Sequence, residues 1–266
     1  MQIMARADRS RKRRSAPRPL GNHQSSWIWG RHLVLETLQA GCWPILELNV
    51  ADDLSSKDLA AVNRSAEQAN IAIRSIARKA LTARCRGEDH QGFAARMAEF
   101  PYRSPDALFE NKCRWPFYLL LDGIRDAFNF GTMLRSAEIF GVQGVVIGTR
   151  EQTGVTSQVA RSSVGAVNRI PIARVESLAA FAGSLEEQDI VVVGASEKGE
   201  TTVTDFDFRR PIALVIGNEG HGISSDVAKK CGGWVRIPQL GTINSLNAAA
   251  AMAILCYEVR RQQATA

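Results

Sequence analysis

Short, continuous apolar runs recur through the second half of the chain, at residues 117–121, 145–147, 190–193, 212–216 and 235–237. Segments long enough to form helices separate most of these runs. Strands buried on both faces have this pattern, because helices cover both sides of a parallel sheet. The pattern therefore predicts an α/β fold with a parallel sheet that begins near Trp115.

The first part of the chain shows a smaller set of elements of the same kind. We expect strands over residues 45–50, 71–76 and 90–98. We expect helices over residues 31–39, 58–69 and 77–83, the first of them ended by Gly41. These elements predict a small α/β domain over residues 26–100 and a larger domain over residues 115–266. Residues 101–114 contain two prolines and are predicted to form a linker that could include one helical turn.

The positive charge of the chain is concentrated at its N-terminus. The net charge is +6, and residues 1–20 hold seven lysines and arginines against one acid, Asp8. Residues 1–25 are poor in apolar residues, so we expect them to form a disordered basic tail. Such a tail can hold the phosphates of a nucleic acid without choosing a nucleotide, or it can only keep the protein in solution.

The composition is typical of a globular protein, with 45% hydrophobic and 23% charged residues. No apolar run approaches the roughly 18 residues that a membrane span needs, and the N-terminus has no apolar signal-peptide core. These features predict a cytoplasmic protein. The five cysteines are widely spaced and form no Cys-x-x-Cys pair, so we expect free thiols and no metal site.

Three segments carry polar residues where a ligand could bind. The first, residues 121–148, has the pattern strand, loop, helix, strand, and its loop lies at the carboxyl end of a strand. Open α/β sheets bind their ligands at this edge. We expect Asn129 to cap a helix over residues 130–140 that Gly141 ends.

Arg135 lies in the second turn of that expected helix, close to the loop. Its position at the ligand-binding edge favours a functional role for Arg135 and for Asn129. The alternative is structural: Asn129 only caps the helix, and Arg135 only pairs with Glu138 one turn later.

The second segment, residues 212–224, is a buried strand followed by a turn rich in glycine. Backbone at Gly217 and Gly220 can approach a ligand closely, and Glu219 can accept a hydrogen bond at the end of the strand. The segment has neither the Gly-Lys-Ser/Thr of a P-loop nor the glycine spacing of a dinucleotide-binding turn. By itself, it could be only a glycine-rich turn with an exposed glutamate.

The third segment, residues 236–262, joins a polar loop to a long helix. Ile237 and Pro238 end an apolar run, and the helix is expected from Leu246 to about Gln262. A loop held directly before a rigid helix suits a small cofactor, although an ordinary N-cap made by Ser245 or Asn244 would look the same.

Together, the three segments resemble the motifs of the SpoU (TrmH-like) branch of the SPOUT superfamily, which comprises S-adenosylmethionine-dependent RNA 2′-O-ribose methyltransferases. The matching residues fall into the three segments in order: Asp126, Asn129, Gly131, Arg135 and Ala137; then Gly217 to Gly220 and Gly222; then Ile237, Pro238, Ser245, Leu246, Asn247, Tyr257 and Glu258. Residues 27–100 are similar, less specifically, to the small RNA-binding domain of many family members.

The resemblance implies a parallel sheet whose C-terminal part threads a loop to form a trefoil knot. It also implies a homodimer that includes the last helix, with RNA as the substrate and no membrane partner. The cofactor would be S-adenosylmethionine, bound at Gly217, Ile237 and Leu246 largely through backbone groups.

The resemblance also assigns a catalytic set: Arg135, Asn129, Glu219, Ser245 and Asn247. Arg135 is the residue that the family uses to activate the 2′-hydroxyl. Arginine offers no acceptor and stays protonated under ordinary conditions, so Arg135 either has a strongly depressed pKa or holds phosphate and developing negative charge. Asn129 and Glu219 would orient Arg135 or the ribose, and Ser245 and Asn247 would brace the site.

Two other classes of protein remain as alternatives. One is a noncatalytic RNA-binding protein, which the intact Arg135, Glu219 and Asn247 disfavour. The other is a nucleotide-dependent oxidoreductase, which the missing glycine fingerprint disfavours. Among RNA substrates, the N-terminal domain favours ribosomal RNA over transfer RNA, by resemblance.

Overall fold

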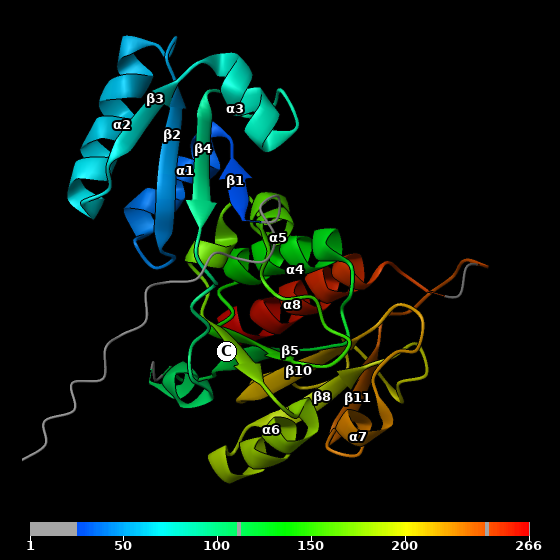
Figure 1. Cartoon of the computed structure of the whole chain (residues 1–266). Helices are drawn as coiled ribbons and strands as arrows, with labels where there is room; N and C mark the ends of the chain where they lie inside the picture. Colours follow the sequence, from blue (N-terminus) through cyan, green and yellow to red (C-terminus); the bar gives the residue numbers. More distant parts are fainter. Residues whose placement is uncertain (1–25, 111–112, 243–244, 266) are drawn as a thin grey trace, which may run out of the picture.

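The computed structural model describes residues 26–110, 113–242 and 245–265 (Figure 1). Two sheets organise these residues, a small one in the first part of the chain and a large one in the second. The predicted basic tail lies outside the described residues.

The large sheet is entirely parallel and has the strand order β7-β6-β5-β10-β8-β11-β9. Its strands are β5 (Phe117–Asp122), β6 (Gly144–Gly148), β7 (Ile172–Val175), β8 (Val191–Ala195), β9 (Thr201–Thr202), β10 (Ile212–Gly217) and β11 (Gly233–Arg236). The parallel sheet and its five apolar strands are confirmed. The apolar pattern did not predict β7 or β9, because β9 has only two residues and β7 carries a charged arginine among four.

Helices cover both faces of the large sheet (Figure 1). They are α4 (Ala127–Ile139), α5 (Ser157–Ser162), α6 (Leu178–Ser184), α7 (Ser225–Ala228) and α8 (Ala248–Ala264), with 3-10 turns η2 (Ala166–Asn168) and η3 (Leu185–Gln188). The sheet has one hydrophobic core on each face, and alternate residues of β5 point into the two cores. Leu119 and Leu121 pack in the core with α4 and α8, whereas Leu120 packs in the core with α6 and α7. No helix in the described ranges has both the length and the apolar character of a membrane span.

The small sheet has the strand order β1-β4-β2-β3. Its elements are β1 (Trp27–Trp29), α1 (Arg31–Ala40), β2 (Ile45–Ala51), α2 (Ser56–Ala69), β3 (Ile73–Ile76), α3 (Arg78–Cys85) and β4 (Phe93–Met97). Gly41 ends α1 in the left-handed conformation, as predicted, with φ at 61°. Strand β1 was not predicted, because three residues are too few to show alternation. The expected helical turn in the linker is the 3-10 helix η1 (Pro105–Phe109).

The small sheet packs on the larger unit through α5 and η2. The guanidinium of Arg161 lies 3.9 Å from the ring centroid of Trp29 and forms an ion pair of 2.9 Å with Asp89. Arg169 pairs with the largely buried Glu36 at 2.5 Å. These contacts hold the two sheets in one arrangement beside α4, which packs directly on α5.

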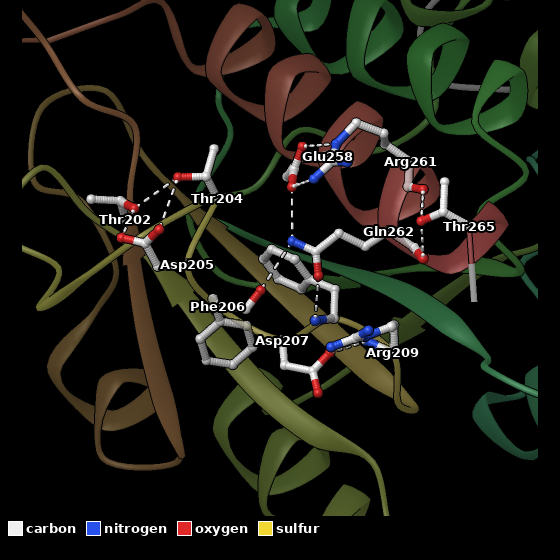
Figure 2. Close-up of polar contacts among 11 residues, drawn as sticks. Thr202, Thr204, Asp205, Phe206, Asp207, Arg209, Glu258, Arg261, Gln262 and Thr265 are labelled. Carbon is white, nitrogen blue, oxygen red and sulfur yellow. Dashed lines mark hydrogen bonds and ion pairs between the residues drawn. The ribbon is translucent and has the colours of Figure 1, made fainter.

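The far end of α8 is anchored to the segment between β9 and β10 (Figure 2). The buried Gln262 accepts a hydrogen bond from the Phe208 backbone N–H at 3.0 Å and donates one to the Phe206 carbonyl at 3.1 Å. It also donates to Glu258 at 2.7 Å, and Arg261 holds that carboxylate with two hydrogen bonds. Glu258 therefore fixes the helix, and its place in the third motif is structural.

Candidate active site and cofactor cavity

Three polar side chains from distant parts of the chain meet at the carboxyl edge of the large sheet. Asn129 donates a hydrogen bond to Glu219 Oε1 at 2.6 Å, and Asn247 donates one to Asn129 Oδ1 at 3.1 Å. Asn129 is on α4, Glu219 follows β10, and Asn247 precedes α8. Strands β5 and β10 are neighbours in the sheet. After β5 the chain continues to β6 on one side, and after β10 it continues to β11 on the other side. Open α/β sheets bind their ligands at such a switch point.

Helix α4 begins three residues earlier than expected, and Asn129 is not its cap. The Asp126 carboxylate accepts a hydrogen bond of 2.6 Å from the Asn129 backbone N–H and so caps the helix. Asn129 therefore lies in the first helical turn, where its side-chain amide remains available for Glu219 and Asn247.

The cap of α8 also differs from the expected one. Asn247, and not Ser245, accepts hydrogen bonds from the backbone N–H groups of Ala249 and Ala250, at 3.0 and 3.2 Å. Asn244, the other expected cap, lies outside the described residues. Asn247 thus uses its oxygen for the helix and its nitrogen for Asn129, which fixes the orientation of the amide.

Arg135 is not part of this hydrogen-bonded set. Its side chain is exposed, and it makes no hydrogen bond or ion pair with the residues that the structure describes, so the expected alternative pair with Glu138 is not formed. Arg135 follows Phe128 by seven residues, two turns of the helix, so both point to the same side of α4. The guanidinium is therefore free to meet an external group.

A cavity of about 580 Å³ opens beside the polar set. Loops after β8, after β10 and before α8 surround it, and its lining includes Gly217, Ile237 and Leu246, the three expected cofactor residues. Glu219 and Ser245 also line it, whereas Asn129, Asn247 and Arg135 do not. The structure therefore divides the predicted residues into a group that lines the cavity, the pair Asn129 and Asn247 beside it, and Arg135, which belongs to neither.

The turn after β10 explains why Gly217 is a glycine. A Cβ atom at Gly217 would lie 2.2 Å from the carbonyl carbon of Gly222, within the same turn. Asn218 accepts a hydrogen bond from the Gly220 N–H at 2.8 Å within the turn, and it donates one to the Gly123 carbonyl, just after β5, at 2.8 Å. The glycine therefore serves the shape of the turn as well as the wall of the cavity.

Several residues of the site carried no signal in the sequence. Residues 195–198, at the end of β8 and directly after it, line the cavity together with Trp234. Asp122 accepts a hydrogen bond of 2.7 Å from the Ser224 N–H and so ties the β5 loop to the β10 loop. Only the rule that ligands bind at carboxyl ends of strands could have pointed to residues 195–198.

Comparison with known proteins identifies the family. Residues 116–257 match the SpoU rRNA Methylase family, and residues 27–103 match the RNA 2′-O ribose methyltransferase substrate binding family. YacO of Bacillus subtilis, which is assigned to the TrmH family of tRNA/rRNA methyltransferases, is 35% identical over 245 residues. That alignment covers 91% of this chain and 98% of YacO.

Solved structures show the same fold over nearly the whole chain. The SpoU methyltransferase AviRb from Streptomyces viridochromogenes, in complex with AdoMet, has a TM-score of 0.77 at 26% identity, covering 90% of this chain and 91% of AviRb. An AdoMet-bound rRNA methyltransferase from Sinorhizobium meliloti has a TM-score of 0.77 at 27% identity, covering 90% and 87% of the two chains. The chain is therefore a member of the SpoU (TrmH) family of RNA methyltransferases.

Proposed function

We propose that this protein transfers a methyl group from S-adenosylmethionine to the 2′-oxygen of a ribose in RNA. The observation that carries the proposal is the Asn129–Glu219–Asn247 set at the rim of a cavity of about 580 Å³. The match of residues 27–103 to a substrate-binding domain of RNA 2′-O ribose methyltransferases supports the ribose as the acceptor.

The cavity suits S-adenosylmethionine in size and chemistry. Its volume lies in the range typical of small-molecule sites. Trp234, Val235 and Leu255 supply apolar wall for an adenine ring, and the turn at Gly217 presents backbone to the interior. The AdoMet complexes of AviRb and of the Sinorhizobium enzyme support the same assignment.

Glu219 is the side chain best placed to hold the ribose. One carboxylate oxygen of Glu219 accepts a hydrogen bond from the side-chain amide of Asn129. The other oxygen makes no hydrogen bond with the described residues, so it can accept a hydrogen bond from a ribose hydroxyl. Asn129 and Asn247 fix the direction of that carboxylate. When bound, S-adenosylmethionine supplies a methyl group on a positively charged sulfur, so the protein has to align the oxygen and remove its proton.

We assign Arg135 the role of a clamp for phosphate and for negative charge that develops on the 2′-oxygen. A guanidinium offers five donors in a planar fork and no acceptor, so it cannot act as a base while it is protonated. Its exposure on α4 allows it to reach RNA bound across the rim. Ser245, at the mouth of the cavity, completes the proposed polar set.

We also propose a homodimer through α4 and α8, which the exposed apolar side chains on these helices support. Phe128 and Ile139 are exposed on α4, and Ile254 and Tyr257 are exposed on α8. The rings of Phe140 and Tyr257 lie 6.3 Å apart, so the two helices form one continuous surface. Because Arg135 lies on the same side of α4 as Phe128, a dimer through this surface would place Arg135 beside the partner subunit.

We predict that an Ile139→Asp/Ile254→Asp variant is monomeric, whereas the natural protein sediments as a dimer. Each aspartate would place a charge in an apolar contact between the subunits. The cost of burying these charges would exceed the stabilisation that apolar burial gives the dimer. Leu59→Asp, at a partly exposed leucine on α2, is the control and should stay dimeric. Sedimentation of the natural protein as a monomer at micromolar concentration would contradict the dimer.

The trefoil knot and a cytoplasmic location belong to the same proposal. Helix α8 follows β11 near the edge of the sheet, yet it packs on α4 and β10, as a chain that passes back through the knot would do. The proposed substrates, ribosomal and transfer RNA, are found in the cytoplasm of bacteria, which supports a cytoplasmic location for the protein.

Ribosomal RNA is the proposed substrate, and transfer RNA is the alternative. We expect labelled methyl groups from S-adenosylmethionine to enter ribosomal RNA from cells that lack the gene, and to enter RNA from normal cells much less, because its site is already methylated. Label that enters only the transfer RNA of the same cells would select the alternative.

A further inference from the structure

The small sheet has one face that its helices cover only in part. Helices α1 and α2 pack on the face that carries Leu48 and Val50. The other face meets only α3, whose Leu81 and Cys85 cover Trp27, Ala51 and Ala94. Beside the residues that Leu81 and Cys85 cover, this second face carries charged side chains.

The strand register places these charged side chains together. Arg96 on β4 lies between Trp27 on β1 and Glu47 on β2, and Asn49 on β2 lies beside Arg74 on β3. Since alternate residues of a strand share a face, Glu47 and Asn49 point to the same side. Arg84, in the last turn of α3, reaches the same place.

A single carboxylate oxygen organises the group. Oε1 of Glu47 accepts hydrogen bonds from Arg84 at 2.8 Å and from Asn49 at 3.3 Å, and it lies 3.5 Å from Arg74. Burial alone would raise the pKa of Glu47, but the hydrogen bonds from Arg84 and Asn49 and the two positive charges lower it below its ordinary value. Glu47 is therefore ionised at neutral pH and holds Arg74 and Arg84 in place.

The cluster nevertheless keeps an excess of positive charge and unused donors. Three arginines face one carboxylate, and the Arg74 and Arg84 side chains are 70% and 34% exposed. Each of these two guanidinium groups uses one nitrogen on Glu47, which leaves most of its donors free. Buried Nε of Arg96 and Oδ1 of Asn49 have no hydrogen-bond partner among the described residues, so Arg96 is not committed to Glu47.

The basic N-terminal segment joins the chain at the same place. Ser26 accepts a hydrogen bond of 2.7 Å from the Met97 N–H, directly beside Arg96, and the seven basic residues of 1–20 precede it in the sequence. Strand β4 points toward α4 and α5 in Figure 1, so Arg96, its penultimate residue, lies at the end of the small sheet nearer the methyltransferase unit. The described part of the chain therefore begins beside Arg96.

We propose that this arginine face, formed by Arg74, Arg84 and Arg96 around Glu47, binds consecutive phosphates of the RNA substrate. The proposal rests on RNA being the substrate, and it assigns the contact to one face of the small domain. Planar guanidinium groups match phosphate in a bidentate manner, and Glu47 already holds Arg74 and Arg84 side by side before RNA arrives. Contacts of this kind position RNA and do not select its nucleotide.

The test compares two double variants that remove the same charge from opposite sides of the small sheet. Arg74→Ala/Arg84→Ala empties the arginine face, and Lys57→Ala/Arg64→Ala is the control on exposed positions of α2. Binding of a fluorescent 24-nucleotide RNA of mixed sequence is measured at several salt concentrations in the full-length protein. We expect the first variant to bind about tenfold more weakly near ~100 mM salt and to lose about one unit of the log–log salt slope.

The control should change the slope by much less. Equal slopes for the two double variants would overturn the arginine face. Arg74→Glu, at a largely exposed position, provides a second variant that leaves the contact of Arg84 with Glu47 in place, and it should weaken binding in the same direction. The circular dichroism spectrum and the melting temperature of every full-length variant show that each one is folded.

Methyl transfer by the natural protein separates the two proposals. If it methylates RNA while both double variants bind RNA alike, the arginine face is wrong and the function stands. If the arginine-face variant alone loses RNA affinity while the natural protein transfers no methyl group, the arginine face stands and the function is wrong.

Discussion

Replacing Arg135 with alanine is expected to lower methyl transfer by at least about 100-fold while leaving S-adenosylmethionine affinity nearly unchanged. Arg135 is exposed, contacts no described residue through a hydrogen bond or ion pair, and does not line the cavity. Its loss therefore removes a group that acts on RNA and leaves the cofactor site intact. Methyl transfer to RNA and calorimetric titration with S-adenosylmethionine measure the two effects separately.

Arg135→Lys should fail as well, because a compact ammonium cannot replace a planar fork on phosphate. The control is Arg210→Ala, which removes an arginine just before β10, at the edge of the sheet opposite the cavity. Loss of cofactor binding in parallel with activity would show that Arg135 is structural, and the clamp would have to be abandoned.

The second large effect is expected at Leu246. Leu246→Arg should weaken S-adenosylmethionine binding by a factor of about 10 to 100, or about 1.4 to 2.8 kcal/mol, because it places a charge in the wall of the cavity. Leu246 is 41% exposed, so the protein should still fold. Calorimetric titration gives the affinity directly.

The same loop supplies a matched control. Leu240 is fully exposed and does not line the cavity, so Leu240→Arg adds the same charge to the loop without entering the proposed site. If folded Leu246→Arg binds the cofactor as tightly as Leu240→Arg does, the cavity is not the cofactor site. Gly217→Val is a poorer test than the sequence suggests, because its Cβ would collide with Gly222 and disturb the turn.

The apolar pattern predicted the architecture because buried parallel strands leave a strong signal. The five runs of the second half became five strands of one parallel sheet, and the family resemblance of the three motifs is confirmed by the match over residues 116–257. Strands β1, β7 and β9 were missed, since runs of two to four residues carry little periodicity.

The polar details of the site were harder to predict because several residues could satisfy the same local rule. Asp126, Asn129, Ser245 and Asn247 are all acceptable N-cap residues, and only the tertiary structure shows that Asp126 and Asn247 form the caps. The contact between Asn129 and Glu219 joins residues 90 positions apart, a distance that no local pattern encodes.

The cavity illustrates the same limit. Gly217, Ile237 and Leu246 were expected to share a site because they belong to motifs, and all three line the cavity. Residues 195–198 line it equally, yet they lie at the end of β8 and just after it without any motif. Their part in the site comes from the sheet order, which places β8 beside β10.

The chemical position of the transferred methyl group is the most direct measurement of the proposed function. RNA from cells that lack the gene is incubated with the purified protein and S-adenosylmethionine that carries a labelled methyl group, then digested to nucleosides and analysed by mass spectrometry. We predict label in a single 2′-O-methylated nucleoside, and none with Arg135→Ala. Label on a base, or no label in ribosomal or transfer RNA, would contradict 2′-O-ribose methylation.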